Sequence, residues 1–337
     1  MFYTLGDYRD ICVGVKEDVI KALEASGEKD TNIHEIEAKI KKHINSVSQQ
    51  TGTTGPPKTD SVEQRKNWWQ THGPDIWHGM ICALTHKTET PGDVDEDVKR
   101  AFFGENNGNE PIKYNYKNVQ LEEETNGAKG QTASPSSDTP LLSEFISRSP
   151  YFRWLEEWGE NFCKERTKRL EKIKDDCYKD DGSEKQYSGD GETCNEILPK
   201  NDGTVRHLEG PSCANSCSSY RKWIKTKRTE YEKQKDRYKT ESVEAESDNE
   251  LSTRLQSLSD AEAFLQKLGP CKKDNENGKG NKTIFYDNGD TFKHTQYCDP
   301  CSEFKINCHN GNCIGDLTKG KCQNNKITAN DIIDDKN

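Results

Sequence analysis

The chain has 337 residues, of which 32% are charged and 30% hydrophobic, and its formal net charge at pH 7 is -10. An acidic surface of this kind disfavours nonspecific binding to nucleic acids or anionic membranes, because both attract positive charge. The sequence contains no run of about 18 apolar residues, the length that a transmembrane helix needs, and no apolar signal core follows Met1. We therefore expect either a cytosolic protein or a segment of a larger one.

The thirteen cysteines are concentrated in the second half of the chain, and only Cys12 and Cys82 precede Cys163. Such density is typical of a loop-rich region that disulfide bonds stabilise in an oxidising compartment. Because the total is odd, one thiol is free or has its partner outside this chain. The candidate disulfide cysteines are Cys82, Cys163, Cys177, Cys194, Cys213, Cys217, Cys271, Cys298, Cys301, Cys308, Cys313 and Cys322.

Zinc is the alternative use of these cysteines. Cys298 and Cys301, followed by Cys308 and Cys313, could supply a four-sulfur site. This spacing is irregular for zinc, and it leaves the other cysteines unexplained. Disulfides are therefore the favoured interpretation, and we expect no bound metal.

Helical periodicity dominates the first hundred residues. Apolar side chains recur at helical spacing in Val15–Gly27 and again in Asn32–Ile44. A turn-rich stretch follows, and then the sequence WWQTHGPDIWHGMICAL, Trp68–Leu84. Gly73 and Pro74 are expected to interrupt this helix, which restarts at Asp75. The core of the helical bundle is predicted to use the large side chains of Trp68, Trp69, Trp77 and Met80.

Residues 104–141 are rich in Gly, Asn, Ser, Thr and Pro and predict a flexible loop between subdomains. A long helix then begins at Pro150, with Ser149 as its cap, and reaches Cys177. A second long helix is predicted from about Ser218 to Lys239. A third starts at a Ser259–Glu262 capping box and stops at Gly269–Pro270.

The stretch TIFYDNGDTFK breaks the helical pattern, and its Asn288-Gly289 is a strong signal for a two-residue β-turn. A hairpin here pairs Phe285 with Phe292 on one face and places Tyr286 on the other. An isolated two-stranded hairpin is marginal, so one face must dock on the helices and the other can stay exposed.

No catalytic motif is present. The sequence lacks a phosphate-binding loop, a nucleophile elbow and a His-Glu-x-x-His zinc motif. His72 and His78 flank the Gly73-Pro74 break and are interpreted as packing or surface residues rather than metal ligands. We expect a binding protein that is not an enzyme and has no cofactor.

The helix Arg221–Lys239 carries nine lysines and arginines against three acidic residues. Such a face could bind a sulfated sugar. The favoured interpretation is a solvated helix with ion pairs between residues four apart, because the net charge of -10 opposes capture of a polyanion. A glycan-binding module stays the alternative.

Long blocks of the chain resemble a known family. The blocks at Trp68–Leu84, Ser149–Cys177 and Pro211–Gln234 are similar to recurring blocks of Duffy-binding-like domains, the adhesion modules of the malaria-parasite erythrocyte membrane protein 1 family. The opening FYTLGDYRDI and the tail FKHTQYCDPCSEFKINCHNGNC most resemble the beta class of these domains. The resemblance spans essentially the whole chain.

The resemblance implies a mostly α-helical Duffy-binding-like fold, with helical bundles in three subdomains, a disulfide-rich C-terminal part and a short β-hairpin. The expected subdomains are residues 1–60, a helical bundle with a flexible loop at 61–148, and a cysteine-rich helical subdomain at 149–337. Family members carry cysteines further upstream, which makes Cys12 the candidate for the unpaired thiol.

The resemblance also implies extracellular display on the infected erythrocyte, as part of a larger membrane protein. The expected partner is a host endothelial receptor, with intercellular adhesion molecule 1 as the first candidate. A different endothelial protein or a sulfated glycan is the alternative. We place receptor contact on the outer face of the Arg221–Lys239 helix and on the hairpin. The candidate contact residues are Lys222, Lys225, Glu232, Lys233, Asp236, Ile284, Tyr286, Phe292, Lys293 and His294.

Overall fold

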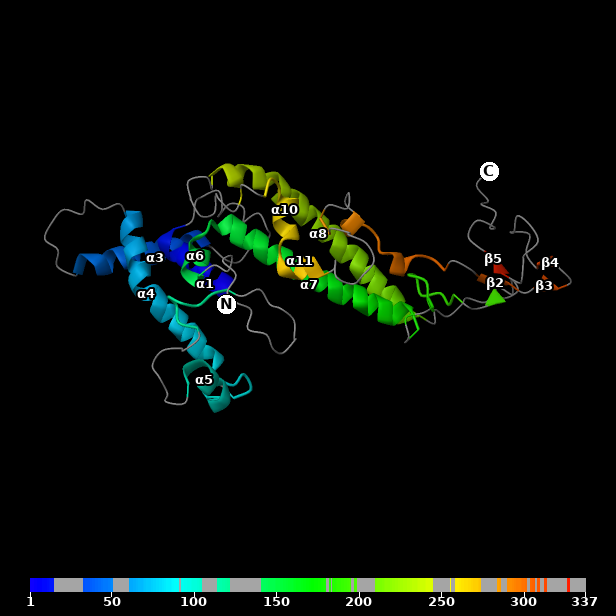
Figure 1. Ribbon diagram of the computed structural model, residues 1–337, viewed down its shortest axis with the longest axis horizontal. Coiled ribbons are helices and arrows are strands. Elements are labelled where there is room, and N and C mark those ends of the chain that lie inside the picture. Colours follow the sequence, from blue (N-terminus) through cyan, green and yellow to red (C-terminus); the bar gives the residue numbers. More distant parts are fainter. Residues whose placement is uncertain are drawn as a thin grey trace. The chain divides into compact units, whose positions relative to one another are not determined.

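The computed structural model describes part of the chain and shows a mostly helical protein (Figure 1). The described residues are 1–14, 33–50, 61–90, 92–104, 114–121, 141–179, 182, 184–194, 197–198, 210–244, 255, 258–273, 284–285, 290–301, 304–306, 308–309, 312–313 and 326–327. The helix expected at Val15–Gly27 and most of the loop expected at 104–141 lie outside these residues. The chain divides into two compact units, residues 1–158 with 244–254, and residues 159–243 with 255–337. The three-subdomain division stays a prediction.

The first unit is a helical bundle. It contains α1 (Phe2–Val13), α3 (Ile33–Gln50), α4 (Ser61–Leu84), α5 (Glu96–Phe103), α6 (Leu142–Ser147) and the start of α7 (Pro150–Cys177). Helix α1 packs against α3, α4 and α6. Its Leu5 is fully buried, and Phe2 stacks on Trp77 with ring centroids 5.7 Å apart.

Two of the predicted core tryptophans, Trp69 and Trp77, are buried in this bundle as expected, whereas Trp68 and Met80 are partly buried at its edge. The predicted break at Gly73-Pro74 was wrong, because α4 runs without interruption through Pro74. Packing explains why the helix tolerates a proline that removes one backbone hydrogen bond. A Cβ at Gly73 would lie only 3.0 Å from the Trp69 indole, so the glycine allows close packing around that ring.

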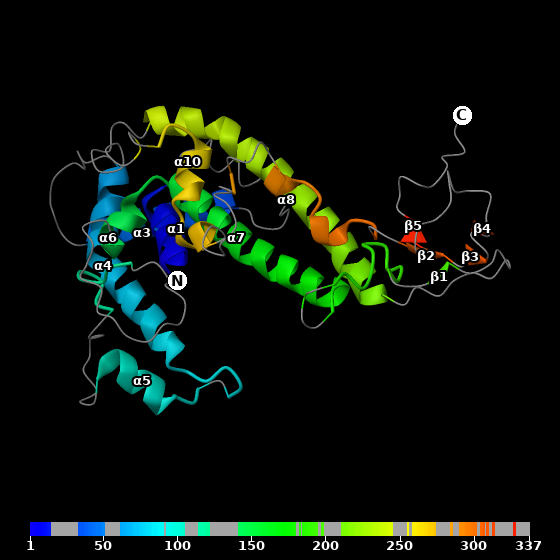
Figure 2. The ribbon, with the colours of Figure 1, turned by 45° about the vertical axis from the view of Figure 1, so that its right-hand side comes forward.

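The second unit is organised around two long antiparallel helices. The rest of α7 runs alongside α8 (Pro211–Glu244) in both ribbon views (Figure 2). Phe162 of α7 stacks on Trp223 of α8 with centroids 5.6 Å apart. The short helices α10 (Ala261–Gln266) and α11 (Gly269–Lys273) complete this part.

The predicted boundaries of these helices were partly right. Helix α7 begins at Pro150, as expected. Helix α8 begins at Pro211 rather than near Ser218, since proline suits the first turn of a helix. The cap of α10 is Asp260 rather than Ser259, and its carboxylate accepts a hydrogen bond from the backbone N–H of Ala263 at 2.7 Å.

The described residues also include five short strands, of which β1 (Ile197–Leu198) lies between α7 and α8 in the sequence and the others follow the helices. Strand β2 (Phe304–Ile306) lies between β1 (Ile197–Leu198), which is parallel to it, and β5 (Lys326–Ile327), which is antiparallel. A two-stranded hairpin joins β3 (Cys308–His309) to β4 (Asn312–Cys313).

A short hairpin is therefore present, but not where the sequence analysis placed it. In the β3–β4 hairpin, His309 pairs with Asn312 across the dipeptide Asn310-Gly311. At the expected site, residues 286–289 lie outside the described part of the chain. Residues Asp290–Phe292, expected to form a strand, form a single 3-10 turn, η2. The Thr291 hydroxyl donates a hydrogen bond to the carbonyl of Ile284.

Among the described residues, four disulfide bonds link cysteines of the second unit. They join Cys163 to Cys271, Cys177 to Cys213, Cys194 to Cys301 and Cys217 to Cys298. The disulfide interpretation is thus confirmed for eight of the twelve candidates. Cys298 and Cys301 are both in disulfides, so in the folded protein they cannot serve as ligands of the four-sulfur zinc site considered above. Cys308 and Cys313 lie opposite each other in the β3–β4 register, but their side chains, like Cys322, lie outside the described part of the structure.

The expectation for Cys82 was wrong, because it is a half-buried free thiol, as is Cys12. The two helices that carry them explain why they do not pair. At one end of α1, Phe2 stacks on Trp77, and at the other end Gly14 lies against the guanidinium of Arg65. Helices α1 and α4 are therefore antiparallel, which places the two thiols at opposite ends of their contact.

Candidate functional site

Helix α8 has one buried face and one exposed face. Tyr220, Ile224, Tyr231 and Tyr238 are all buried, as the helical periodicity predicts. The five candidate contact residues of this helix are exposed, namely Lys222, Lys225, Glu232, Lys233 and Asp236. The predicted buried and exposed faces of α8 are therefore confirmed.

The exposed face of α8 carries excess positive charge. Arg228 pairs with Glu232 four residues on, with 2.9 Å between Nε and Oε1. In the part of the chain that the structure describes, Lys222, Lys225 and Lys233 have no carboxylate partner. The ion pairs expected on a solvated helix are thus present, but among the described residues they leave Lys222, Lys225 and Lys233 without a paired carboxylate.

Aromatic packing makes α8 a rigid support for that face. Phe292 stacks on Tyr231 with ring centroids 4.8 Å apart and also contacts Phe162 of α7 at 5.3 Å. Phe285 packs against Tyr231 and Phe292. Each such ring pair adds about 0.5–1.5 kcal/mol beyond the burial of its area. Lys235 further ties α8 to Glu262 of α10, a hydrogen bond that raises the pKa of this lysine.

Two of the candidate contact residues are buried instead. Ile284 is 4% exposed and Phe292 is 7% exposed. Ile284 and Phe292 are therefore core residues and not surface residues, and Phe292 packs against Tyr231 of α8. Tyr286 lies outside the described residues.

Lys293 and His294 are exposed, as expected, and lie beside groups that the sequence analysis did not single out. His294 Nε2 lies 2.8 Å from Asp299 Oδ1, and the Lys185 ammonium donates to the Asp299 carbonyl. Burial lowers the pKa of Lys185, and the negative charge of Asp299 opposes this shift. The imidazole, carboxylate and ammonium form one charged group at the surface.

Two tyrosines adjoin this charged group. Tyr178 and Tyr297 meet edge to face, with centroids 5.8 Å apart. Partial burial raises the pKa of Tyr178, with Tyr297 and Asp299 adding to the effect. The disulfides Cys217–Cys298 and Cys194–Cys301 hold the loop on either side of Asp299. These disulfides bring Asp299 close to Lys185, which is far from it in the sequence. Because the sequence does not reveal which cysteines pair, it could not predict this cluster.

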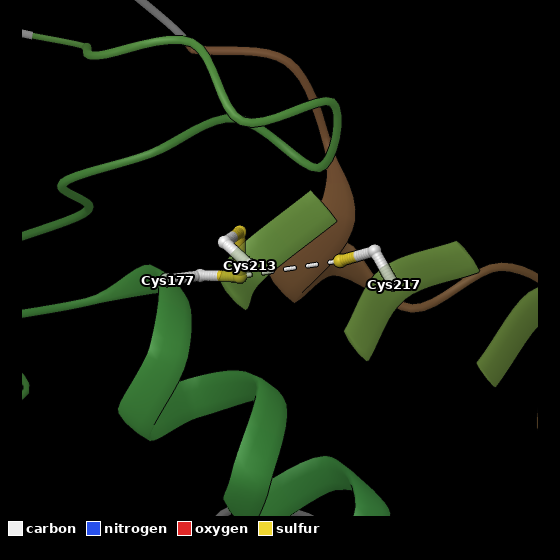
Figure 3. Close-up of side chains that lie close together, drawn as sticks. All are labelled: Cys177, Cys213 and Cys217. Carbon is white, nitrogen blue, oxygen red and sulfur yellow. Dashed lines mark hydrogen bonds between the residues drawn. A yellow bond between two sulfur atoms is a disulfide. The ribbon is translucent and has the colours of Figure 1, made fainter. Parts of the chain in front are cut away.

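The described residues contain one group with the spacing of metal ligands, which is Cys177, Cys213 and Cys217 (Figure 3). Two disulfides occupy these sulfur atoms in the folded protein. His72 and His78 pack against Trp68 and Phe103, respectively, in line with the packing role expected for them. What the described surface offers is a charged helix face and a tyrosine-containing cluster on rigid supports, features that suit binding of a macromolecule.

No helix in the described parts of the chain is both long and apolar enough to cross a membrane.

Comparisons with solved structures identify relatives of this fold. The NTS-DBL1(alpha-1) domain of Plasmodium falciparum membrane protein 1 from the varO strain has a TM-score of 0.55 and 20% identity, over 93% of this chain and 65% of that one. The N-terminal NTS-DBL1-alpha and CIDR-gamma double domain of the same strain gives 0.55 and 19%, over 94% of this chain and 42% of that one. The chain thus spans less than two thirds of the length of either structure.

A third structure, the ICAM-1-binding DBLbeta domain of Plasmodium falciparum erythrocyte membrane protein 1 variant IT4var13, has 21% identity and a TM-score of 0.33, over 72% of this chain and 41% of that one. That likeness is too weak to support a conclusion. No curated protein sequence matches this chain significantly.

Sequence matching to families covers most of the chain. Residues 1–187 match the Duffy binding domain, and residues 157–296 match the C-terminal subdomain of the Duffy-binding-like domain. Together with the helical fold and the disulfide-linked second unit, these matches show that the chain belongs to the Duffy-binding-like domain family.

Proposed function

We propose that this domain is a host-cell adhesion module that binds a protein receptor on endothelial cells, and that it is displayed on infected erythrocytes within a larger surface protein. The observation that carries the proposal is the exposed face of α8, where Lys222, Lys225 and Lys233 have no carboxylate partner among the described residues. Membership of the Duffy-binding-like family supports the same interpretation.

Intercellular adhesion molecule 1 is our first candidate for the receptor. The support is the resemblance of the opening FYTLGDYRDI and the cysteine-rich tail to the beta class of Duffy-binding-like domains. The proposed contact surface comprises the exposed face of α8 together with Lys293 and His294. The adjoining Lys185, Tyr178, Tyr297 and Asp299 extend it.

Surface plasmon resonance against the immobilised outermost domain of intercellular adhesion molecule 1 tests this proposal. Lys225→Glu should weaken binding by more than about threefold, equal to about 0.65 kcal/mol. The matched control is Lys42→Glu, which makes the same charge change at an exposed position of α3 in the other unit. Circular dichroism confirms that both variants are folded.

Each outcome separates one alternative. If Lys225→Glu and wild type bind with equal affinity, the contact surface does not include this face of α8. Absence of binding at micromolar concentrations would exclude this receptor in favour of another endothelial protein. A sulfated glycan as the true ligand would show a steep loss of affinity with rising salt, because polyanion binding releases counterions.

A further inference from the structure

Four cysteine sulfur atoms meet at the end of the α7–α8 pair. Cys177 is the last residue of α7, and Cys213 and Cys217 lie one turn apart at the start of α8. The sulfur atoms of these three residues lie within 4.8 Å of one another, and all three side chains are fully buried (Figure 3). Cys298, bonded to Cys217, brings a fourth sulfur atom to the same place.

The spacing between the two disulfides is that of a metal site. Sγ of Cys177 lies 4.0 Å from Sγ of Cys217, to which it is not bonded. In a tetrahedral zinc–thiolate site with bonds of about 2.3 Å, neighbouring sulfur atoms are about 3.8 Å apart. Once the disulfides are reduced, small side-chain rotations would bring the sulfur atoms of Cys177, Cys213 and Cys217 to that separation, and Cys298, the disulfide partner of Cys217, would supply the fourth sulfur atom.

We propose that this chain, after a phosphine or thiol reductant has supplied two electrons and two protons to each of these two disulfides, binds one thiophilic divalent cation, such as Zn²⁺, through Cys177, Cys213, Cys217 and Cys298. Four thiols bind the ion as thiolates and release four protons, which leaves a site of charge -2 and involves no change in oxidation state. This set differs from the tail cysteines whose spacing first suggests zinc, and it shares only Cys298 with them.

Contacts other than the disulfides also join the two helices that carry three of the ligands. Ser216 donates a hydrogen bond to the carboxylate of Asp176, next to Cys177. Further along the pair, the Arg169 guanidinium lies 5.0 Å from the centre of the Trp223 ring. These contacts join α7 to α8 and involve no cysteine side chain.

The end of α8 also suits an anionic metal site. Cys213 is the third residue of α8, so it lies in the first turn, where the backbone N–H groups carry the partial positive charge of the helix N-terminus. The adjacent carboxylate of Asp176 opposes this effect, but it is itself paired with Lys172 at 3.2 Å. Complete burial excludes the water that would otherwise compete for the metal.

Cobalt binding by the reduced chain tests the proposal. The full chain is reduced with a phosphine under anaerobic conditions and titrated with Co²⁺, whose thiolate complexes give intense visible bands in a tetrahedral field, and Zn²⁺ is then added as a competitor. To remove the tail thiols, the titration uses a background in which Cys308, Cys313 and Cys322 are replaced by serine. One equivalent of tetrahedral cobalt is expected in that background, displaced by one equivalent of zinc.

Variants in the same background assign the ligands. Cys213→Ser with Cys217→Ser should abolish stoichiometric binding, and Cys298→Ser should abolish the four-thiolate spectrum. The matched controls, Cys163→Ser with Cys271→Ser and Cys194→Ser with Cys301→Ser, each remove two sulfur atoms of another disulfide and should bind cobalt as before.

The cobalt titration tests the site even if the reduced chain is unfolded before metal is added. Circular dichroism follows its helix content during the titration, and a gain in helicity on addition of one equivalent of metal would support the proposal. The proposal is wrong if the background without Cys308, Cys313 and Cys322 binds no cobalt. It is also wrong if the variant with Cys213→Ser and Cys217→Ser binds cobalt like the controls.

Discussion

Arg153 of α7 and Asp10 of α1 form a buried ion pair inside the first unit. The Arg153 guanidinium, which is 0% exposed, also donates hydrogen bonds to the carbonyl oxygens of Ile146 and Arg148 at 3.1 Å and 2.5 Å. One arginine thus ties α1 and the loop between α6 and α7 together. Gly6 allows this approach, because a Cβ there would lie 2.6 Å from Arg153 Nε.

Asp10 should make the stability of the first unit depend on pH. Burial raises the pKa of this carboxyl from 3.8 to about 6, outweighing the opposite effects of Arg153 and Arg9. Since the folded state holds the proton more tightly than the unfolded state, the contribution of this group is fully present below pH 3.8 and is lost as pH rises through about 6. The loss amounts to at most about 3 kcal/mol.

Urea unfolding of wild type and Asp10→Asn at pH 4 and pH 7 measures this effect. The variant lacks the titrating group, so the stability of wild type minus that of Asp10→Asn should fall between the two pH values. A constant offset is expected in addition, because the variant leaves Arg153 without its charged partner. A difference that stays flat or grows with pH would contradict the assigned pKa direction.

Thiol labelling should distinguish the two units of the protein. Cys12 and Cys82 should react with a maleimide when the oxidised chain is unfolded without reductant, since both are free. The eight cysteines of the four disulfides should stay unlabelled. Peptide mapping by mass spectrometry reads the result. A label on Cys163 or Cys271 would contradict the disulfide between them. An unlabelled Cys82 would contradict its being a free thiol.

Loss of the Cys163–Cys271 disulfide should destabilise the second unit more than the first. This bond closes a loop with a sequence separation of 108 residues, and removing a native disulfide typically costs about 2–5 kcal/mol. Hydrogen exchange of the Cys163→Ser, Cys271→Ser double variant should show faster exchange in α10 and α11, with little change in α1 and α4. Cys82→Ser, which removes no bond, is the control and should exchange like wild type.

Sequence periodicity predicted the parts of this fold that repeat over many turns. The buried tyrosines and exposed lysines of α8 follow from a regular pattern along a helix of 34 residues. Local signals were less reliable where tertiary packing opposed them. The Gly73-Pro74 break is overridden because α4 gains its core contacts on both sides of it, through Trp69 and Trp77.

The hairpin and the charged cluster show what sequence patterns could not supply. The Asn288-Gly289 signal placed a strand where burial of Phe292 against Tyr231 instead favours a compact turn. The cluster around Asp299 depends on the disulfide that joins Cys194 to Cys301, across 107 residues of sequence. Cysteine count predicts that disulfides exist, but it does not fix which cysteines pair.

Gly159 should be a position where even one methyl group destabilises the second unit. A Cβ on this residue of α7 would lie 2.5 Å from Leu265 Cδ2 and 2.6 Å from Leu268 Cδ1, far inside van der Waals contact. Leu265 is fully buried and Leu268 nearly so, and the carbonyl of Gly159 also lies 3.5 Å from Cys271 Sγ. The leucines therefore have little room to move away, and overpacking of this kind costs about 1–3 kcal/mol.

Gly79 of α4 is the matched control for this prediction, because a Cβ there would have no neighbour within 4 Å. Gly79→Ala should leave stability unchanged or raise it by up to about 1 kcal/mol, since alanine is the better helix former. Gly159→Ala should lower it by about 1–3 kcal/mol. Urea unfolding, with near-ultraviolet circular dichroism as a probe of the aromatic cluster, measures both. Equal stability of the two variants would mean that α10 and α11 do not pack against α7 as closely as the structure shows.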